Sequence, residues 1–333
     1  MTSVFKQVGF IYNPKAAEKT FLTIVKPIIE QEFGERLYKT VATEKASGGY
    51  DSAKQLVEEG CDLVVACGGD GTNHDVVNGI MGEDGNPKCA MAVVPLGTGD
   101  DFCRSIGLSQ HDVSDLTAKY QFIISTLASS GKVIDIDVGS VEPTPLSGEA
   151  KRHWFINEAS FGFSADVIQA VNEQTSFWIS RDFTFQFKSI SMTFTYQSKT
   201  LKLRLFNDLD EQIHEEEAVN QLVAVSNGQY FGAGMQINPG ALINDGVLNL
   251  CKFGDVSAWN MIWIMGNIYT GLHGEHPRVS FNKCSKLVAE CQEDVYVEAD
   301  GEIVGKLPAT FKCNHKKLKF IVPATCLEAK YSL

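Results

Sequence analysis

The sequence predicts an α/β domain followed by an all-β, sandwich-like domain, and a change of pattern along the chain predicts this order. Over residues 1–131, short continuous apolar runs alternate with segments of helical periodicity, which indicates a doubly wound parallel sheet with helices on both faces. From about residue 132 the strands alternate apolar with polar residues between Gly, Asn and Asp turns, a pattern typical of antiparallel sandwich sheets. We therefore expect a first domain over 1–131 and a β-rich domain over 132–314.

The elements of the first domain follow in order from the N-terminus. Residues 8–12 (VGFIY) form a β-type run that Asn13 and Pro14 end. Helical spacing covers residues 20–31, although Pro27 weakens this helix. The next expected elements are a helix over 51–59, a buried strand over 62–67, a helix over 72–81 and a buried strand over 89–94.

Short strands dominate the second domain. They are expected over 201–206, 221–225, 247–250, 286–289 and 295–298. A helical insertion rich in aromatic residues, over 177–196, interrupts them, and residues 143–150 read as a loop at a strand tip.

Charge and cysteine content limit the functional class. A net charge of −12 argues against a sequence-independent nucleic-acid binder and against simple electrostatic adhesion to anionic lipid. Nine cysteines without C-x-x-C spacing indicate free thiols in a reducing compartment rather than a disulfide framework or a zinc site. No signal-peptide pattern opens the chain, and the apolar segment 256–272 is too short and too interrupted to span a bilayer. We expect a cytoplasmic protein.

Two glycine-rich loops follow the two buried strands of the first domain. The first is GGDGT at Gly68–Thr72 and the second is PLGTGDD at Pro95–Asp101. In a parallel sheet both loops emerge at the carboxyl edge, where ligands bind, and glycines allow a phosphate to approach the backbone. Neither loop fits the P-loop or the dinucleotide fingerprint, so the pair predicts a phosphate site of another kind.

Three aspartates in these loops need an explanation. Asp70, Asp100 and Asp101 would repel the phosphates of a nucleotide unless a divalent cation stood between them. Magnesium held by one or two carboxylates and by substrate oxygens is the usual arrangement. The alternative is that these residues cap helices or turns, and Asp101 could serve only as the N-cap of residues 102–106.

A third stretch, at residues 295–304, contains Asp300-Gly301 between alternating strands. Taken alone, it is best interpreted as a tight hairpin turn. Asp300 and Glu302 are nonetheless two nearby carboxylates, and a carboxylate beside a substrate hydroxyl can act as general base in phosphoryl transfer.

These motifs together resemble those of the diacylglycerol kinase catalytic-domain family of lipid kinases, which includes bacterial diacylglycerol kinases, sphingosine kinases and ceramide kinases. The resemblance covers nearly the whole chain in the right order. It rests on GGDGT (68–72), PLGTGDDFCR (95–104), IDVG (136–139), FINEASFGF (155–163), NGQYFGAG (227–234), PGA (239–241) with DG (245–246), and ADGE (299–302).

The resemblance implies a fold and an activity. It implies an N-terminal domain similar to NAD kinases and phosphofructokinases, a β-rich domain that holds the lipid, and a last strand near 318–322 that returns, with residues 315–333, to the first domain. It also implies transfer of the γ-phosphoryl group of ATP, with Mg²⁺, to a hydroxyl of diacylglycerol, a sphingoid base or ceramide. The implied partners are ATP and a lipid alcohol at a membrane surface, with no nucleic acid, and a homodimer is left open.

The family motifs also imply roles for particular residues. The implied catalytic residues are Asp70, Asp300 and Glu302, with Asp300 the preferred general base. The implied ATP-binding residues are Asn13, Gly68, Gly69, Gly71, Thr72, Gly97, Thr98, Asp100 and Asp101. The implied metal ligands are Asp70, Asp101, Asp137 and Asp245, and Asp135 is a rival for the role of Asp137. The candidate lipid-binding residues are Phe161, Phe163, Phe183 and Phe185, the last two within the aromatic insertion, whose side chains could equally be core.

The sequence departs from the family pattern at several positions. The first loop, at residues 13–17, lacks the usual Ser and Gly, and Asn73-His74-Asp75 replaces the usual Leu-Asn-Glu. Asn244 precedes Asp245 where a paired aspartate is common. Asp100 replaces an asparagine and adds negative charge beside the nucleotide; a protonated His74 could compensate, but we favour an ordinary helix-surface histidine.

Three alternatives remain at this point. The protein could be a kinase for a soluble acceptor, related to NAD kinase, or a lipid-binding protein whose kinase site is impaired. Residues 259–268 (WNMIWIMGNI) could contact a membrane, although helical spacing favours buried packing.

Overall fold

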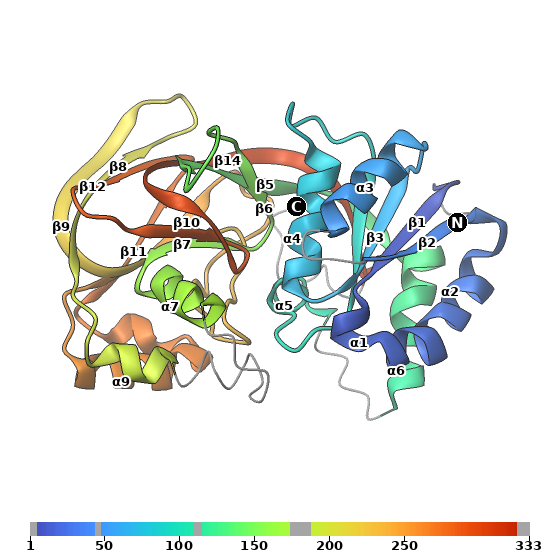
Figure 1. The fold of residues 1–333 in the computed structure, drawn as a ribbon, viewed down its shortest axis with the longest axis horizontal. Coiled ribbons are helices and arrows are strands. Elements are labelled where there is room, and N and C mark those ends of the chain that lie inside the picture. Colours follow the sequence, from blue (N-terminus) through green and yellow to red (C-terminus); the bar gives the residue numbers. More distant parts are fainter. Residues whose placement is uncertain (1–4, 44–47, 109–114, 174–187, 325–333) are drawn as a thin grey trace. The chain divides into compact units, whose positions relative to one another are not determined.

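The computed structural model describes residues 5–43, 48–108, 115–173 and 188–324. The chain divides into two compact units (Figure 1). The first unit contains residues 1–138, 242–245 and 315–333, and the second contains residues 139–241 and 246–314. The first unit therefore includes residues 132–138 and 242–245, which the sequence analysis assigned to the second domain.

A parallel sheet forms the centre of the first unit. Its strands lie in the order β14–β4–β3–β1–β2, where β14 contributes its C-terminal residues through the pair Phe320 and Met91. The strands are β1 (Val8–Tyr12), β2 (Leu37–Ala42), β3 (Leu63–Gly68), β4 (Ala90–Pro95) and β14 (Glu302–Val322). All these pairings are parallel, which confirms the predicted α/β architecture.

Helices cover both faces of this sheet (Figure 1). Helices α3 (Gly48–Glu58) and α4 (Asp70–Met81) lie on one face, and α2 (Lys26–Phe33) and α6 (Leu116–Ser125) lie on the other. Every residue of β3 and β4 is buried as a result, and this is why both strands read as continuous apolar runs.

The helix expected over 20–31 is divided. Helix α1 (Pro14–Thr20) is followed by a π-helical turn at Phe21–Val25, and α2 then begins at Lys26. Pro27 lies in the first turn of α2, where its missing N–H costs no hydrogen bond of that helix. A continuous helix would need that N–H as a donor, so regular i to i−4 hydrogen bonding cannot run through residue 27.

The second unit is an antiparallel sandwich whose two sheets share long strands. In β9 (Gln212–Ser226), residues 212–220 pair with β8 (Lys199–Phe206), and residues 222–226 pair with β7 (Glu158–Gly162). Strand β14 changes partner in the same way, from β13 (Tyr296–Ala299) to β12 (Lys286–Cys291). Strands that switch sheets form the corners of such sandwiches, and the predicted sandwich-like fold is confirmed.

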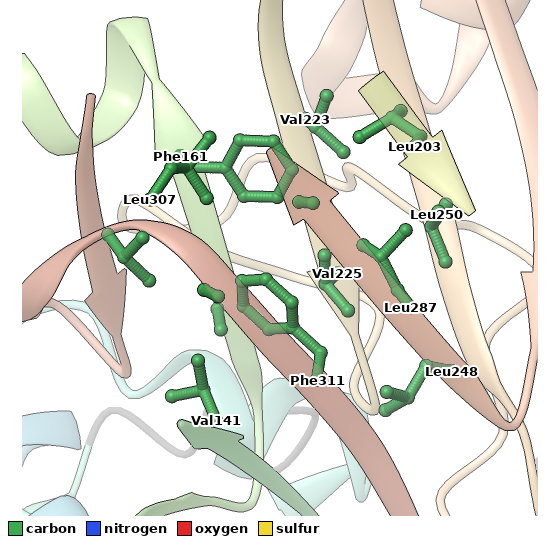
Figure 2. Packing of buried hydrophobic residues seen from close by; sticks show 14 of the residues in the cluster. Val141, Phe161, Leu203, Val223, Val225, Leu248, Leu250, Leu287, Leu307 and Phe311 are labelled. Carbon is green, nitrogen blue, oxygen red and sulfur yellow. The ribbon is translucent and has the colours of Figure 1, made fainter. Parts of the chain in front are cut away.

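Apolar side chains fill the space between the two sheets (Figure 2). Phe161 of β7 stacks on Phe311 of β14, with ring centroids 5.5 Å apart. Leu203, Val223 and Leu287 pack around them from three further strands. This cluster is the main core of the second unit.

A second apolar cluster lies on the other face of β9 and β10 (Leu248–Gly254). Leu222 of β9 and Phe253 of β10 point into it, whereas their neighbour Val223 points into the main core. Helices α7 (Phe163–Asn172) and α9 (Ala258–Asn267) cover this second cluster. Strands β9 and β10 are therefore apolar on both faces in this region.

The outer elements of the second unit are β5 (Lys132–Thr144), β6 (His153–Phe155) and β11 (Val279–Cys284), and β5 begins in the first unit. The eight cysteines that the structure describes are free thiols, as predicted. Within the described ranges, no helix combines the length and apolar character needed to cross a bilayer.

Candidate active site

The two glycine-rich loops of the first unit touch each other. A Cβ atom on Gly97 would lie 2.5 Å from the Cα atom of Gly69, and a Cβ atom on Gly68 would lie 2.2 Å from Thr72 Oγ1. Contacts this short are forbidden, so glycine is required at these positions for the loops to pack. The close approach brings the ends of β3 and β4 to one edge of the sheet, as the sequence predicted.

Asp70 links the first loop to the second. Its Oδ2 accepts a hydrogen bond of 3.0 Å from the backbone N–H of Asp101, and its Oδ1 accepts one of 3.2 Å from that of Phe102. These residues begin helix α5 (Asp101–Ser105), so Asp70 caps a helix that lies far from it in the sequence. The capping alternative therefore holds for Asp70, whereas Asp101 is the first residue of α5 and not its N-cap.

Asp100 adopts a left-handed backbone conformation, with φ 48° and ψ 42°. Apart from glycine, asparagine and aspartate adopt this conformation most readily, which accounts for an aspartate in place of the family's asparagine. Its Oδ1 accepts a 3.0 Å hydrogen bond from Gly97 N. Burial, with the neighbouring Asp70 charge, raises the pKa of Asp100 to about 7.

The loops offer a donor set that suits a magnesium ion. Asp70 and Asp100 are close enough that the charge of one disfavours ionisation of the other, and a cation would relieve this repulsion. Asp101 is buried with its Oδ1 3.8 Å from Arg104 Nε, which partly neutralises it. Among the residues described, no three His, Cys, Asp or Glu side chains form a metal cluster. An ion here would therefore depend on one or two carboxylates together with phosphate oxygens.

Asn13 lies at the same edge of the sheet. It follows β1, and its backbone N–H donates to the carbonyl of Cys67, one residue before Gly68. Its side-chain oxygen accepts from Lys15 N and caps helix α1. The proposed ATP-binding residues thus come from the ends of three neighbouring strands, β1, β3 and β4.

The interpretation of His74 as a surface histidine is wrong. His74 is only 7% exposed, and its Nε2 lies 3.4 Å from Asn78 Nδ2 on the next turn of α4. The helix packs against β3 and α3, so the turn that carries His74 faces the interior of the unit.

Asp137 joins three chain segments of the first unit. Its Oδ1 accepts hydrogen bonds from His315 Nδ1 at 2.9 Å and from Lys316 N at 2.7 Å, and its backbone N–H donates to Ile243 O. Asp245 belongs to the same short segment as Ile243, residues 242–245. The rival Asp135 lies at the surface and pairs with Lys319 at 3.2 Å.

In the second unit, Asp300 and Gly301 form the tight turn between β13 and β14. Their φ values are 48° and 87°, both positive, as a two-residue hairpin of type I′ requires. The carboxylate of Asp300 accepts three backbone hydrogen bonds of 3.1–3.2 Å, from residues 156–158. The expected hairpin is present, and the carboxylate also fixes the segment that leads into β7. Glu302 is the first residue of β14 and is partly exposed.

The sequence reasoning did not identify Glu298, Glu158, Ser160 and Ser164. Glu298 is fully buried and accepts hydrogen bonds from Ser160 Oγ and, at 2.9 Å, from Gly301 N. Burial raises its pKa to about 7, although these hydrogen bonds act in the opposite direction. Register places Glu298 directly opposite Ser160 in the β13–β7 pair, and only strand pairing could have revealed this.

An apolar pocket of about 320 Å³ opens in the second unit. Residues of the helices α7 and α9, of the strands β9 and β10, and residues 189–190 contribute to its wall. Its lining includes Phe163, Ser164, Val167, Ser189, Leu222, Phe231, Met235, Phe253, Met261, Met265 and Ile268. Of the candidate lipid-binding residues, Phe163 lines this pocket, Phe161 lies in the sandwich core, and Phe183 and Phe185 fall outside the described residues.

Helix α9 beside this pocket is buried on one face only. Met261 and Ile264 are packed in the second cluster, as the buried-packing interpretation expected. Trp259 is 76% exposed and Trp263 42% exposed, and neither position was expected at the surface on that interpretation. Phe194 contacts Trp259 edge to face and is itself exposed, so large apolar side chains gather beside the pocket.

Comparisons with known proteins agree with the motifs. The family model of the diacylglycerol kinase catalytic domain matches residues 7–141, and that of the YegS C-terminal NAD kinase beta sandwich-like domain matches residues 157–322. The diacylglycerol kinase of Staphylococcus epidermidis is 28% identical over 320 residues, which cover 96% of this chain and 92% of that protein. The diacylglycerol kinase of Staphylococcus aureus strain Newman is 27% identical over 308 residues, which cover 92% and 89% of the two chains.

Solved structures share the fold. A crystal structure of a diacylglycerol kinase from Bacillus anthracis superposes with a TM-score of 0.67 at 18% identity, over 98% of this chain and 100% of that one. Another structure from the same organism gives a TM-score of 0.72 at 19% identity, with the same coverage. Two family models in the expected order, together with the two loops and the Asp300 hairpin, lead to one conclusion: the chain belongs to the diacylglycerol kinase family of lipid kinases.

Proposed function

We propose that this protein is an ATP- and Mg²⁺-dependent kinase that transfers the γ-phosphoryl group to the free hydroxyl of a diacylglycerol-type lipid. The apolar pocket of the second unit carries this proposal, because a soluble acceptor such as a nucleotide or sugar would not need a lining dominated by Phe, Leu, Ile, Met and Val. The names of the curated relatives support the same acceptor.

The loops of the first unit are suited to bind ATP. The glycines at 68, 69 and 71 and the start of α4 offer backbone N–H groups to phosphate oxygens, and Gly97, whose N–H donates to Asp100, lets the second loop approach them closely. Asp70 and Asp100, with Asp101, would hold magnesium together with the phosphates. Bound Mg²⁺ would neutralise charge that develops on the transferring phosphoryl group. Asp70 also keeps the two loops in register through its amide hydrogen bonds.

Asp300 is the proposed base for the acceptor hydroxyl. Three backbone amides bind this carboxylate and fix its direction. The lipid hydroxyl would donate to the carboxylate and be aligned in this way for attack. Glu302, two residues further on, adds negative charge beside this base.

The exposed aromatic side chains are the proposed membrane contact. Helix α9 carries no charged residue over Ala258–Asn267, and its tryptophans lie beside the pocket that would take the acyl chains. Tryptophan and phenylalanine favour the interface of a bilayer, and a net charge of −12 argues against simple electrostatic adhesion to anionic lipid. Docking would then place the pocket where its lipid is dissolved.

A phosphorylation assay tests the proposed reaction. The full chain is incubated with radiolabelled ATP, Mg²⁺ and a panel of lipid alcohols, and the products are extracted into organic solvent and identified by mass spectrometry. We expect label in phosphatidic acid for the wild type, with turnover reduced at least about a hundredfold in Asp70→Asn and Asp300→Asn. Label that stays in the aqueous phase would indicate a soluble acceptor, and no turnover with any lipid would indicate a lipid-binding protein without kinase activity.

Vesicle sedimentation tests the membrane contact. Neutral phosphatidylcholine vesicles should retain the wild type and lose most of the double variant Trp259→Ser, Trp263→Ser. The control is Leu209→Ser, which removes an equally exposed apolar side chain (73%) from the turn between β8 and β9. Equal binding by all three proteins would contradict the proposed contact.

A further inference from the structure

The apolar pocket of the second unit has a buried interior and an exposed rim. Val167, Leu222 and Met261 line its interior and are at most 3% exposed. Ile190 and Tyr269 line it as well, but they are 55% and 52% exposed and so belong to its rim. Both rim side chains are large and mainly apolar, so this part of the rim offers a hydrocarbon chain an apolar entry.

A short series of hydrogen bonds links the pocket to the turn that carries Asp300. Ser164 lines the pocket, and its Oγ lies 2.7 Å from Ser160 Oγ. Ser160 Oγ bonds to Glu298 Oε1, and Glu298 Oε2 accepts from Gly301 N at 2.9 Å. Only two side chains therefore separate this wall of the pocket from the turn, and all of them belong to the second unit. A lipid whose hydroxyl group contacts Asp300 can thus place an acyl chain in the pocket.

The volume of the pocket limits what it can hold. This volume is about 320 Å³. An apolar cavity of about 150 Å³ holds one benzene ring, so a cavity of about twice that volume holds about twelve carbon atoms. Each chain of a membrane lipid spans about 15 Å, half of the apolar core of a bilayer, and fills such a cavity by itself. Two chains of that length do not fit together.

We propose that the pocket takes one acyl chain, of up to about twelve carbon atoms, and that the second chain of a diacylglycerol stays outside it, in the bilayer. The inference rests on the proposed function and defines its substrate class more closely. One acyl chain and one free hydroxyl group are then sufficient for recognition, so a monoacylglycerol is a substrate as well as a diacylglycerol. The hydroxyl group still donates to Asp300, and the pocket binds only hydrocarbon.

Binding of monoacylglycerols of increasing length measures the capacity of the pocket. The full chain is equilibrated with octanoyl-, decanoyl-, dodecanoyl- and tetradecanoylglycerol, each below its aggregation concentration, and bound lipid is measured by equilibrium dialysis. We expect the affinity to rise about three- to fourfold per methylene group up to dodecanoylglycerol, the effect of burying one CH₂, and then to stay within about twofold. A rise of the same size from dodecanoyl- to tetradecanoylglycerol would overturn the inference.

Lengthening the second chain tests whether it also enters the pocket. In 1-dodecanoyl-2-acetylglycerol the first chain fills the pocket, and replacing acetyl by hexanoyl adds methylene groups to the second chain alone. We expect the wild type to bind these two lipids with affinities within about twofold of each other. A gain of about three- to fourfold per added methylene group would show that the protein buries both chains, and the inference would be wrong.

Two variants change the capacity of the pocket in opposite directions. Val167→Phe places a ring in its wall and should lower the limit to about eight carbon atoms, so dodecanoylglycerol should lose its advantage over octanoylglycerol. Met261→Ala removes side-chain atoms from the wall and should raise the limit, so tetradecanoylglycerol should bind about tenfold more tightly than dodecanoylglycerol. The matched control is Val219→Phe, the same substitution at an exposed position of β9, which should keep the wild-type limit.

Thermal unfolding of each variant confirms that it is folded before affinities are compared. The second-chain measurement uses the wild type alone, so it decides the question if a variant does not fold. An unchanged limit in both folded variants would overturn the inference, and so would failure of the wild type to bind any monoacylglycerol. Phosphorylation of a lipid alcohol by the same protein would leave the proposed function intact in either case. Absence of both lipid binding and lipid phosphorylation would overturn the two together.

Discussion

Asp100 is a carboxylate whose charge the fold opposes, and its replacement by asparagine isolates that charge. Asparagine tolerates the same left-handed backbone, with φ near 48°, and its Oδ1 can still accept from Gly97 N. Asp100→Asn therefore removes the charge and keeps the geometry. Any change in stability reports the electrostatic cost of burying an anion at this position, beside the charge of Asp70.

The magnitude follows from the pKa. An acid whose pKa rises from 3.8 to about 7 on folding destabilises the folded state by at most about 4 kcal/mol when it is ionised. The penalty is complete above about pH 7, becomes smaller as the pH falls, and vanishes near about pH 4, where the unfolded chain also holds the proton. The variant should therefore gain stability at about pH 8, and its gain should shrink toward acidic pH.

Urea unfolding in the presence of a chelator measures this gain. Trp154, Trp259 and Trp263 lie in the second unit, so their fluorescence follows that unit. Far-ultraviolet circular dichroism reports the helices of both units, and most of the described helices belong to the first. The control is Asp115→Asn, an exposed aspartate that caps α6 and whose role asparagine can fill. A gain in stability of the same size at about pH 8 and at about pH 4 would refute the electrostatic reasoning, and so would no gain in the dichroism transition at about pH 8.

Two further changes test the packing of each unit. Gly97→Ala places a Cβ atom 2.5 Å from the Gly69 Cα, so the two loops must move apart. We expect the variant to bind an ATP analogue at least about tenfold more weakly, measured by calorimetry. Unaltered affinity would mean that the loops tolerate this separation. Phe311→Ala removes a buried ring from the core of the sandwich and should lower the free energy of unfolding by about 3–5 kcal/mol, measured by tryptophan fluorescence. A loss below about 1 kcal/mol would show that neighbouring side chains fill the space.

The architecture could be predicted from the sequence where burial is uniform along a strand. Strands β3 and β4 are buried on both faces, so an uninterrupted run of apolar residues marks each of them. The extent of β9 and β14 could not be predicted, because each strand changes partners part of the way along. In β9, residues 222–226 are apolar on both faces and therefore lose the alternation that marks a sandwich strand.

Only the parts of the candidate site that lie within one short stretch of sequence could be predicted. Glycine loops after buried strands identified the phosphate region, because a short motif contains both the strand end and the turn. The cap that Asp70 provides to α5 spans 31 residues, and the Ser160–Glu298 contact spans 138, so neither follows from local pattern. The burial of His74 also depends on which face of α4 meets the sheet. Tertiary pairing, rather than residue type, decides these positions.

Amide anchoring of Asp300 gives one more prediction, on stability as well as activity. In Asp300→Asn, one side-chain oxygen can still accept from Asn157 and Glu158, but an NH₂ group would face the N–H of Ile156. One buried N–H is left without an acceptor, so we expect a loss of about 1–3 kcal/mol in unfolding free energy, measured by tryptophan fluorescence in urea.

Glu302→Gln is the matched control for Asp300→Asn. It removes a carboxylate from the same hairpin that accepts none of these three amides, and it should unfold with the wild type. If Asp300→Asn also unfolds with the wild type, the three amide hydrogen bonds do not depend on the carboxylate, and the argument that they fix its direction for the lipid hydroxyl fails. If Asp300→Asn unfolds at a lower urea concentration and also loses turnover, the same carboxylate both stabilises the turn and contacts the substrate.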